Sequence, residues 1–221
     1  MKTITSNKYL EMWESIYINL RRHKFNGKFI VFEGIDGSGK STLLERLFEY
    51  LSEHGVECIK TYTPTKEIRE LSYWKEYAQA GTDRTYFDPF GLDMIAFADR
   101  MVWQNRFLEP NLEKGNVVLC DRHILNSLVY NQDNIFVQLL PRIIRPDLGF
   151  VTYTDLNIAN ERINQRGETE NIEDIKEKKI IAERYFKLAI KNDYIVVDTN
   201  HSINKSFITI VEHINRLFKI K

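Results

Sequence analysis

The amino-acid sequence predicts a three-layer α/β/α fold, in which a five-stranded parallel sheet lies between two layers of helices. Short apolar runs typical of buried strands alternate with longer amphipathic segments, and this alternation indicates a parallel sheet covered on both faces. A glycine-rich loop after the first strand is a second indication, because such sheets bind ligands at the carboxyl ends of their strands. The expected strands are Lys28–Glu33, Val56–Tyr62, Asn116–Asp121, Gly149–Asp155 and Tyr194–Asp198.

Amphipathic segments with apolar residues at helical spacing lie between these strands and after the last one. The first of them, "STLLERLFEYLSEHG", ends at a glycine, which is a common helix stop. The chain has 221 residues, of which 43% are hydrophobic and 28% charged, and this suits one domain with a sizeable core. The expected helices are 41–55, 66–80, 90–113, 124–140, 156–166, 172–191 and 203–219.

Composition weighs against several classes of partner. The 31 basic and 31 acidic residues give a formal net charge of zero, whereas general nucleic-acid binders usually have a basic excess, so we expect no nucleic-acid partner. No apolar run reaches membrane-spanning length and none is typical of a signal peptide, so we expect a cytoplasmic protein with no membrane partner. Cys58 and Cys120 lie in apolar strand-like runs, which favours reduced core residues over a disulfide or metal pair.

The stretch "FIVFEGIDGSGKST" contains G-x-x-x-x-G-K-[ST], the phosphate-binding loop of P-loop NTPases. Its glycines permit positive φ angles, so that N–H groups can surround an anion at a helix N-terminus. Lys40 can reach the β- and γ-phosphates, and the Ser41 hydroxyl can coordinate Mg²⁺. A plain glycine-rich turn is the alternative. The expected nucleotide-binding residues are Gly34, Asp36, Gly37, Ser38, Gly39, Lys40, Ser41 and Thr42.

An acid and several arginines follow the loop in the sequence. The strand in "VVLCDR" ends on Asp121, which can hold the water shell of Mg²⁺ as a Walker-B acid does; an ordinary helix N-cap is the alternative. Arg69, Arg100 and Arg122 suit an anionic acceptor phosphate, because the guanidinium is a planar fork. Taken singly, Arg100 is typical of a surface charge, and Phe97, one turn earlier, of a core residue.

Two segments flank this arrangement. The run "NKYLEMWESIYINLRRH" has leucine and aromatic residues at helical spacing, which predicts an additional N-terminal helix. We assign residues 1–27 to a helical extension, which either covers the core or contacts another subunit, and residues 28–221 to the domain that contains the phosphate loop. The polar stretch 163–179 is either a solvated helix pair or a lid over the phosphates.

Motifs along most of the chain resemble those of the thymidylate kinase family and occur in the same order. They are "FIVFEGIDGSGKST", "FADR", "CDRHILNSLVYN", "RPDLGFVTYTD", "RINQRGETENIED" and "AERYFKLA", and they cover roughly Lys28 to Lys219. Many NTPases share the phosphate loop, whereas the Asp-Arg-His run followed by Ser127 and Tyr130 is more specific. The resemblance implies transfer of the ATP γ-phosphoryl group to dTMP, with ATP and Mg²⁺ as cofactors and a nucleoside monophosphate, dTMP, as the partner substrate.

The resemblance also implies roles on the donor side. Lys40 and the loop N–H groups would bind the ATP phosphates, while Ser41 and Asp121 would form the metal site. The lid would supply an arginine, either Arg162 or Arg166. The implied catalytic residues are Lys40, Asp121, Arg122 and Arg166.

On the acceptor side, the resemblance implies that Arg100 and Arg122 clamp the acceptor phosphate and the thymine edge. Phe97 would stack on the base, Ser127 would face the thymine ring and Tyr130 would lie under the deoxyribose. The family is typically dimeric through helices beside the sheet, so we expect a homodimer, with Trp103 either at the contact or in the core. The implied substrate-binding residues are Asp36, Arg69, Phe97, Arg100, Arg122, Ser127 and Tyr130.

The sequence departs from the family pattern after the second strand. The family usually carries Arg-Glu-Pro-Gly there, whereas this chain has "TYTPTKEIRE". Pro64 remains, but Tyr62 and Thr63 occupy the arginine and glutamate positions, and Lys66 or Arg69 is the candidate replacement. The lid also lacks an arginine of the pattern. These departures keep alternatives open: a related nucleotide or nucleoside kinase with a different acceptor, a non-catalytic nucleotide-binding module, or a P-loop ATPase coupled to nucleic acid.

Overall fold

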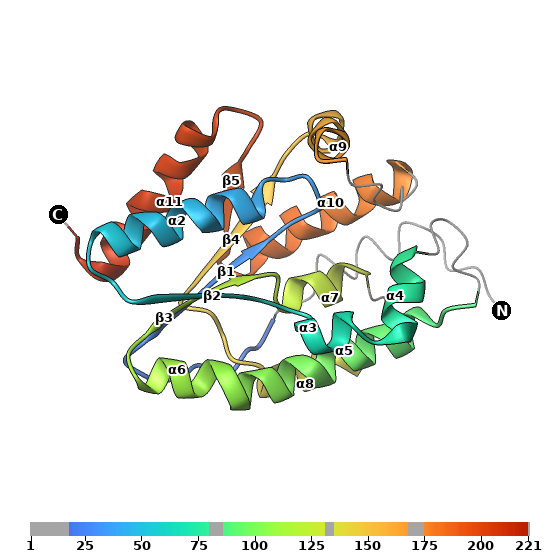
Figure 1. Ribbon diagram of the computed structural model, residues 1–221, viewed down its shortest axis with the longest axis horizontal. Helices are drawn as coiled ribbons and strands as arrows, with labels where there is room; N and C mark the ends of the chain where they lie inside the picture. Colours follow the sequence, from blue (N-terminus) through green and yellow to red (C-terminus); the bar gives the residue numbers. More distant parts are fainter. Residues whose placement is uncertain (1–17, 80–85, 131–134, 168–174, 221) are drawn as a thin grey trace.

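A computed structural model describes residues 18–79, 86–130, 135–167 and 175–220 of the chain. Within these ranges the strands form one parallel sheet in the order β2-β3-β1-β4-β5, with β1 in the centre (Figure 1). The predicted fold class is therefore confirmed. The strands are β1 Lys28–Glu33, β2 Cys58–Tyr62, β3 Val117–Asp121, β4 Leu148–Tyr153 and β5 Ile195–Asp198.

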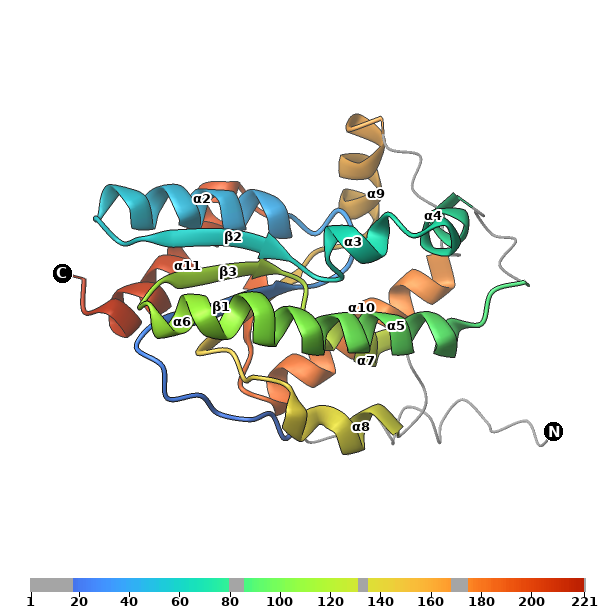
Figure 2. The same cartoon turned by 60° about the horizontal axis from the view of Figure 1, so that its bottom comes forward.

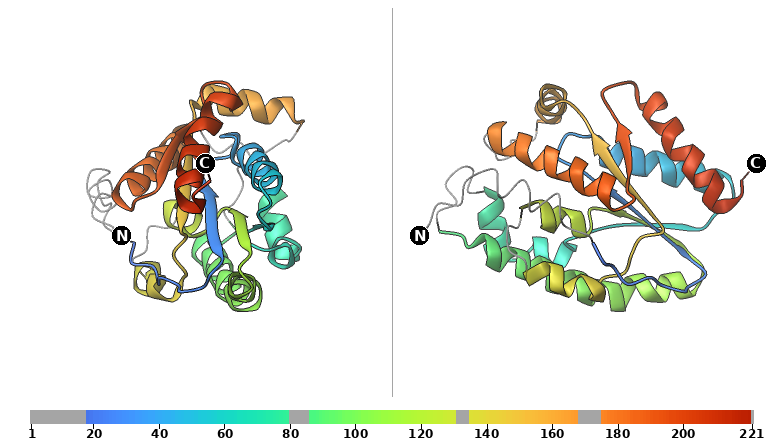
Figure 3. Two further views of the ribbon diagram at one scale, coloured as in Figure 1. Left: turned by 90° about the vertical axis from the view of Figure 1, so that its left-hand side faces the viewer. Right: turned by 180° about the vertical axis from the view of Figure 1, so that it is seen from behind.

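Helices cover both faces of this sheet, as the alternating pattern predicts. On one face lie α2 (Lys40–Glu53) and α11 (Ile203–Phe218), while α5 (Pro89–Trp103), α7 (Ile124–Tyr130) and α10 (Ile175–Lys191) cover the other face (Figures 1 and 3). The remaining segments are α3 Lys66–Arg69, α4 Ser72–Gln79, η1 Gln104–Leu108, α6 Glu109–Glu113, α8 Ile135–Leu139, η2 Leu140–Arg142 and α9 Leu156–Gln165.

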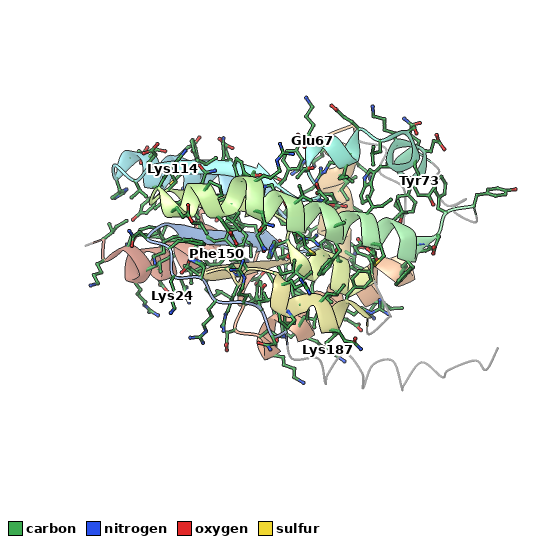
Figure 4. All side chains as sticks on the ribbon, turned by 90° about the horizontal axis from the view of Figure 1, so that it is seen from below. Lys24, Glu67, Tyr73, Lys114, Phe150 and Lys187 are labelled. Atoms are coloured by element: carbon green, nitrogen blue, oxygen red, sulfur yellow. The ribbon has the colours of Figure 1, made fainter. Side chains whose placement is uncertain are left out.

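Alternation along β1 builds two cores, one on each side of the sheet. Phe29 and Val31 face the α5, α7 and α10 side, whereas Ile30 and Phe32 face α2 and α11. Figure 4 shows Phe150 between the layers, while Lys24 and Lys114 project outward. A sheet that is buried on both faces explains why the strands are nearly continuous apolar runs.

The helix predicted over 90–113 is one continuous helical rod (Figure 2), made of α5, a π-helical turn η1 and α6. Pro110 lies in the first turn of α6 and has no N–H, so it cannot bond to the carbonyl four residues earlier; a π-turn accommodates such a break. The side chain of Asn111 donates to the carbonyl of Phe107 at 2.7 Å, which satisfies one acceptor of this turn.

The prediction of an N-terminal helix is wrong for residues 18–27, which are not helical. Arg21 instead forms a short parallel bridge with Ile144, and Ile18 and Leu20 are buried in the core beside α10 and η2. In this segment the backbone therefore pairs with the residues before β4, although the spacing of its apolar residues is typical of a helix. Residues 1–17 lie outside the described residues.

The carboxyl ends of the parallel strands lie along one rim of the sheet. The loops that follow them lead from β1 to α2, from β2 to α3, from β3 to α7, from β4 to α9 and from β5 to α11. None of the described helices is long and apolar enough to cross a membrane. Both cysteines are free thiols, as predicted, with Cys120 buried and Cys58 half-buried.

Candidate active site

The glycine-rich loop joins β1 to α2 at the centre of the rim. Gly37 has a φ of 77°, and a Cβ atom there would lie 2.4 Å from the carbonyl oxygen of Ala159 on α9. Gly39, with a φ of 87°, is the N-cap of α2. Only glycine adopts these angles without strain and allows such close approach. The loop therefore presents backbone N–H groups and the N-terminus of α2 to one point, as an anion site requires.

Side chains behind the loop fix its shape. The Ser38 hydroxyl donates to the carbonyl of Ile35 at 2.6 Å and lies 2.6 Å from Oγ1 of Thr152, while Thr199 Oγ1 donates to the Ser38 carbonyl at 2.9 Å. Ser38 is fully buried. Its side chain thus supports the loop from inside, and its backbone N–H also donates to the carbonyl of Ile35, at 3.3 Å.

Lys40, the lysine of the motif, is folded back over the loop. Its Nζ atom donates to the carbonyl of Ile35 at 2.8 Å and lies 3.7 Å from Oδ1 of Asp36. The side chain is only 5% exposed. A buried ammonium group held at the loop is positioned to meet phosphate oxygens with little loss of conformational entropy.

Ser41, in the first turn of α2, contacts Asp121, the last residue of β3, although 80 residues separate them in sequence. Ser41 Oγ donates to Asp121 Oδ2 at 2.7 Å, and Asp121 Oδ1 is buried with no hydrogen-bond partner among the described residues. This pair fits Mg²⁺, which is usually held by one or two carboxylates together with substrate phosphates and water. In the described part of the chain, no group of three or more His, Cys, Asp or Glu residues forms a metal cage.

Arg122 follows Asp121 and is held at both ends of its guanidinium. Its backbone adopts a φ of 69°, and its N–H donates to the carbonyl of Phe32 at 2.8 Å. The Nη1 atom donates to Oδ1 of Asn126 at 3.0 Å, and Nη2 forms an ion pair with Asp36. Arg122 thereby connects the end of β3 with the phosphate-binding loop.

Glu33, the last residue of β1, anchors the turn between β3 and α7. Its Oε1 atom accepts from the N–H groups of His123 and Leu125, each at 2.9 Å. Glu33 is fully buried, and this burial raises the pKa of its carboxyl group to about 7, although the Arg100 charge and the two N–H groups act in the opposite direction. One buried carboxyl group therefore fixes the backbone on which Arg122 is mounted.

Arg100 on α5 and Ser127 on α7 form a buried hydrogen-bonded pair. Arg100 Nη1 donates to Ser127 Oγ at 3.3 Å, and the arginine side chain is 0% exposed. Its Nε and Nη2 atoms have no partner within the described ranges. Burial lowers the pKa of Arg100, with the Glu33 charge opposing that effect. Buried donors without partners are rare in folded proteins, although neither Arg100 nor Ser127 lines the cleft beside the phosphate loop.

A cleft of about 870 Å³ opens above the phosphate loop and the ends of β2 and β3. Basic residues outnumber acidic ones on its walls, which favours an anionic ligand. The cleft is lined by residues of the loop and α2, of β2, of α3 and α4, and of the β3–α7 turn, together with Arg166. Its charged residues are Asp36, Lys40, Glu45, Lys60, Arg69, Lys75, Asp121, Arg122 and Arg166.

Arg69, one of the two candidates to replace the missing strand-end arginine, lies on this cleft. Its guanidinium lies 4.4 Å above the ring of Tyr62, and its Nε donates to the carbonyl of Pro64 at 2.9 Å. Lys66 does not line the cleft; it pairs with Glu70 at 3.6 Å on the outer surface. The geometry therefore favours Arg69 over Lys66 on the acceptor side.

A smaller cavity of about 150 Å³ lies on the other side of the loop, beside Thr42. Arg162 lines it and donates to the carbonyls of Thr199 at 2.7 Å and of Gly37 at 3.4 Å. Arg166 lines both cavities. The two arginines thus differ: Arg162, on α9, is bonded to the loop, whereas Arg166, at the C-terminal cap of α9, is exposed and lines both spaces.

Some predicted residues do not line the cleft. Phe97 is 2% exposed and packs against Phe136 at a ring distance of 5.5 Å in the core. Tyr130 is half-buried at the end of α7, against the same core. Trp103 is buried as well, next to Phe29. Stacking by Phe97 and the sugar contact of Tyr130 remain predictions, and residues 168–174 of the predicted lid lie outside the described residues.

Comparison with known proteins identifies the family. The family model described as thymidylate kinase matches residues 32–210, which is well over half of the chain. This chain belongs to the thymidylate kinase family. It is 34% identical to the thymidylate kinase of Caldicellulosiruptor saccharolyticus over 161 residues, which cover 66% of this chain and 74% of that protein. It is 30% identical to the probable thymidylate kinase of Pyrobaculum aerophilum, covering 87% of this chain and 99% of that protein.

Several residues of this candidate site were not predicted from the sequence. Glu33 and Thr199 were missed because their partners are backbone groups far away in sequence. Trp74 and Lys75 line the cleft from α4, which no motif marks. Asn126 carried a signal that could have been used, because it follows Arg122 by four residues, one helical turn, inside a quoted motif.

The altered "TYTP" segment takes part in this site. Thr63 is fully buried, and its Oγ1 donates to the carbonyl of Arg122 at 2.9 Å. Thr65 donates from its N–H and its hydroxyl to Asp99, each at 2.7 Å. The two threonines thus connect β2 with the arginine turn and with α5, so the substitution changes the support of the acceptor side as well as its charge.

Proposed function

We propose that this chain transfers the γ-phosphoryl group of ATP to dTMP, giving ADP and dTDP. One arrangement supports the proposal above all: Ser41 donates to Asp121 at one end of the phosphate-binding loop, and Asp36 forms an ion pair with Arg122 at the other. A nucleotide-binding module has no need of a fixed arginine opposite its loop. Two phosphorylated ligands that meet there would account for both features.

On the donor side, the loop N–H groups, the N-terminus of α2 and Lys40 would bind the phosphates of ATP. Ser41 and Asp121 would hold Mg²⁺, which supplies neutralisation of phosphate charge when bound. The small cavity beside Thr42 would take the nucleoside end of ATP, because it adjoins the loop on the side away from Arg122. Thr199 and Arg162 keep the loop in shape from that side.

On the acceptor side, Arg122 would bind the phosphate of the monophosphate, with Arg69 at the same wall of the cleft. Arg100 and Ser127 would read the base edge. Arg100 has two buried donor atoms without a partner among the described residues, and a thymine carbonyl oxygen is an acceptor that would satisfy them. The Ser127 hydroxyl can donate or accept at the neighbouring ring position.

The chemistry requires little acid–base assistance from the chain. The attacking atom is a phosphate oxygen of the acceptor, which is already ionised at neutral pH, so no strong general base is needed. Lys40 and Arg122 would hold donor and acceptor in line and stabilise the charge on the transferred group. Arg166, exposed above both cavities, would add a further positive charge from α9.

The first test incubates the purified protein with ATP, Mg²⁺ and dTMP and separates the nucleotides by chromatography. We expect ADP and dTDP to appear in equal amounts, with no ADP formed when dTMP is omitted. ADP formation without dTMP would instead indicate an ATPase. Binding of ATP with no product in any mixture would indicate a nucleotide-binding module.

We also propose that two copies of the chain associate through the face formed by β2 and α5. A mostly apolar groove of about 810 Å³ lies there, beside the edge strand of the described sheet, and Val102 in it is 53% exposed. Light scattering should give twice the chain mass of 26.2 kDa. Val102→Asp should yield the monomer, whereas Ile208→Asp, at a 59% exposed site on α11, should not. A wild-type monomer would contradict the proposal.

A further inference from the structure

We propose that Tyr185, buried on α10, is a positioning residue that aims the Arg122 guanidinium at the acceptor phosphate by holding Asn126 in place. The proposal rests on the proposed function for the identity of the ligand. The positioning itself is a property of the free protein. Tyr185 belongs to the motif "AERYFKLA". No residue of this motif has a role in the donor or acceptor site described above.

Four side chains form a continuous chain of contacts from α10 to the loop. The Tyr185 hydroxyl donates to Asn126 Oδ1 at 3.0 Å, and Arg122 Nη1 donates to the same oxygen at 3.0 Å. Arg122 Nη2 then forms the ion pair with Asp36. The amide oxygen of Asn126 thus accepts from two sides, which fixes the plane of the amide and, through it, one edge of the guanidinium.

Orientation matters for this arginine because it has to meet a phosphate. A guanidinium binds phosphate best as a planar fork with two parallel N–H donors, so a rotation about its long side chain weakens the contact even when the charge stays close. The Asp36 ion pair alone fixes one nitrogen. Asn126, held by Tyr185, fixes a second nitrogen and so defines the plane in which the remaining donors lie.

Tyr185 is suited to be a permanent donor. Its side chain is 2% exposed, and burial raises the pKa of its hydroxyl well above the ordinary value, so the proton stays in place. The helix that carries it is also tied to α7, because Arg184 Nη1 donates to the carbonyl of Val129 at 2.7 Å. Two consecutive residues of the motif therefore bind the helix that carries Asn126.

The test compares Tyr185→Phe with Tyr194→Phe. Tyr194 is a matched control, because it is also buried and its hydroxyl has no hydrogen-bond partner among the described residues. We expect Tyr185→Phe to raise the KM for dTMP about fivefold, the effect of one net hydrogen bond, with the KM for ATP and the Tm equal to those of the control. Equal dTMP KM values in the two variants, or a parallel loss on both substrates with a lower Tm, would overturn the proposal.

A double-mutant cycle tests whether Asn126 transmits the effect. In the background of Asn126→Ala, which itself raises the KM for dTMP, the additional change Tyr185→Phe should have no further effect on that KM. Residues that act through one shared contact are non-additive in this way. If the two substitutions multiply instead, Tyr185 acts by another route and the proposal fails.

A measurement without substrate separates this proposal from the proposed function. In the free protein, the Nε–H NMR signal of Arg122, assigned by its loss in Arg122→Lys, should broaden or shift in Tyr185→Phe and stay unchanged in Tyr194→Phe. That result would support the positioning role even if no nucleoside monophosphate were phosphorylated. An Arg122 signal that is the same in wild type and Tyr185→Phe would overturn it, whatever the activity.

Discussion

At the residue scale, the buried acid Glu33 links fold and site. It ends the central strand, and it binds the two N–H groups that shape the Arg122 turn. Its Oε2 atom has no partner within the described residues, and this agrees with a carboxyl group whose pKa is raised to about 7 by burial. The site therefore contains a group that titrates in the physiological range without taking part in the chemistry.

This titration predicts a pH-dependent stability. The pKa of Glu33 is raised from 4.5 in the reference state to about 7 in the fold, so the folded protein binds the proton more tightly. The stabilising contribution is complete below pH 4.5 and is lost as the pH rises towards 7. Relative to Glu33→Gln, the wild type should lose up to roughly 3 kcal/mol of unfolding free energy across this window. Urea unfolding from pH 4.5 to 8 measures it; parallel curves for the two proteins would contradict it.

Lys40 and Arg122 predict a loss of rate without a loss of fold. We expect Lys40→Ala and Arg122→Ala to lower kcat by about a thousandfold, because each removes a fixed positive charge from the transferring phosphoryl group. The Tm should stay close to that of wild type. Lys114→Ala, at an exposed lysine far from the cleft, serves as the control. Turnover near the wild-type rate in either site variant would refute the role given to that residue.

Sequence patterns could locate many of these residues but could not determine how they are supported. The loop and the acid at the end of β3 follow from local motifs and from the rule that strand ends share a rim. The contacts of Glu33, Asn126 and Tyr185 depend on packing between elements. The spacing of apolar residues in the sequence does not predict such contacts. Phe97 is apolar at helical spacing, and that pattern does not distinguish a core ring from a stacking ring.

At the element scale, the strands and helices largely follow the predicted pattern, and the differences have local causes. The helix over 90–113 contains a π-helical turn just before Pro110, which lacks a donor. Residues 18–27 are not helical, and Arg21 among them pairs with Ile144. The most strongly amphipathic described helix is α11, which begins at the Ser202 cap. Its apolar face, formed by Phe207, Ile210 and Ile214, completes the core under α2.

A matched pair on α11 tests this packing. Ile210 is fully buried, whereas Ile208 on the opposite face is 59% exposed. Ile210→Ala should lower the unfolding free energy by about 2–5 kcal/mol, because it leaves a cavity in a close-packed core. Ile208→Ala should change it by about 0.5 kcal/mol or less. Denaturant unfolding of both variants measures the difference, and equal values would show that α11 does not pack as described.

At the scale of the whole molecule, one rim of the sheet collects groups from five separate loops. The phosphate loop after β1, the arginine turn after β3 and α9 after β4 surround the large cleft together with α3 and α4. Parallel topology places these segments together, so the sequence could predict their shared location. It could not predict the acceptor, since "TYTP" changes residues that contact the Arg122 backbone and the cleft wall.

The most direct test of the central claim is therefore the acceptor itself. A coupled ADP-release assay with ATP and Mg²⁺ should be run with dTMP, dUMP, dCMP, dGMP, UMP and thymidine. We predict that kcat/KM for dTMP exceeds that for each other acceptor by about tenfold or more, since even one methyl group is discriminated to that extent by a fitted pocket. Preference for another acceptor would show that the altered segment has changed the second site, and absence of transfer to all six would contradict the kinase assignment.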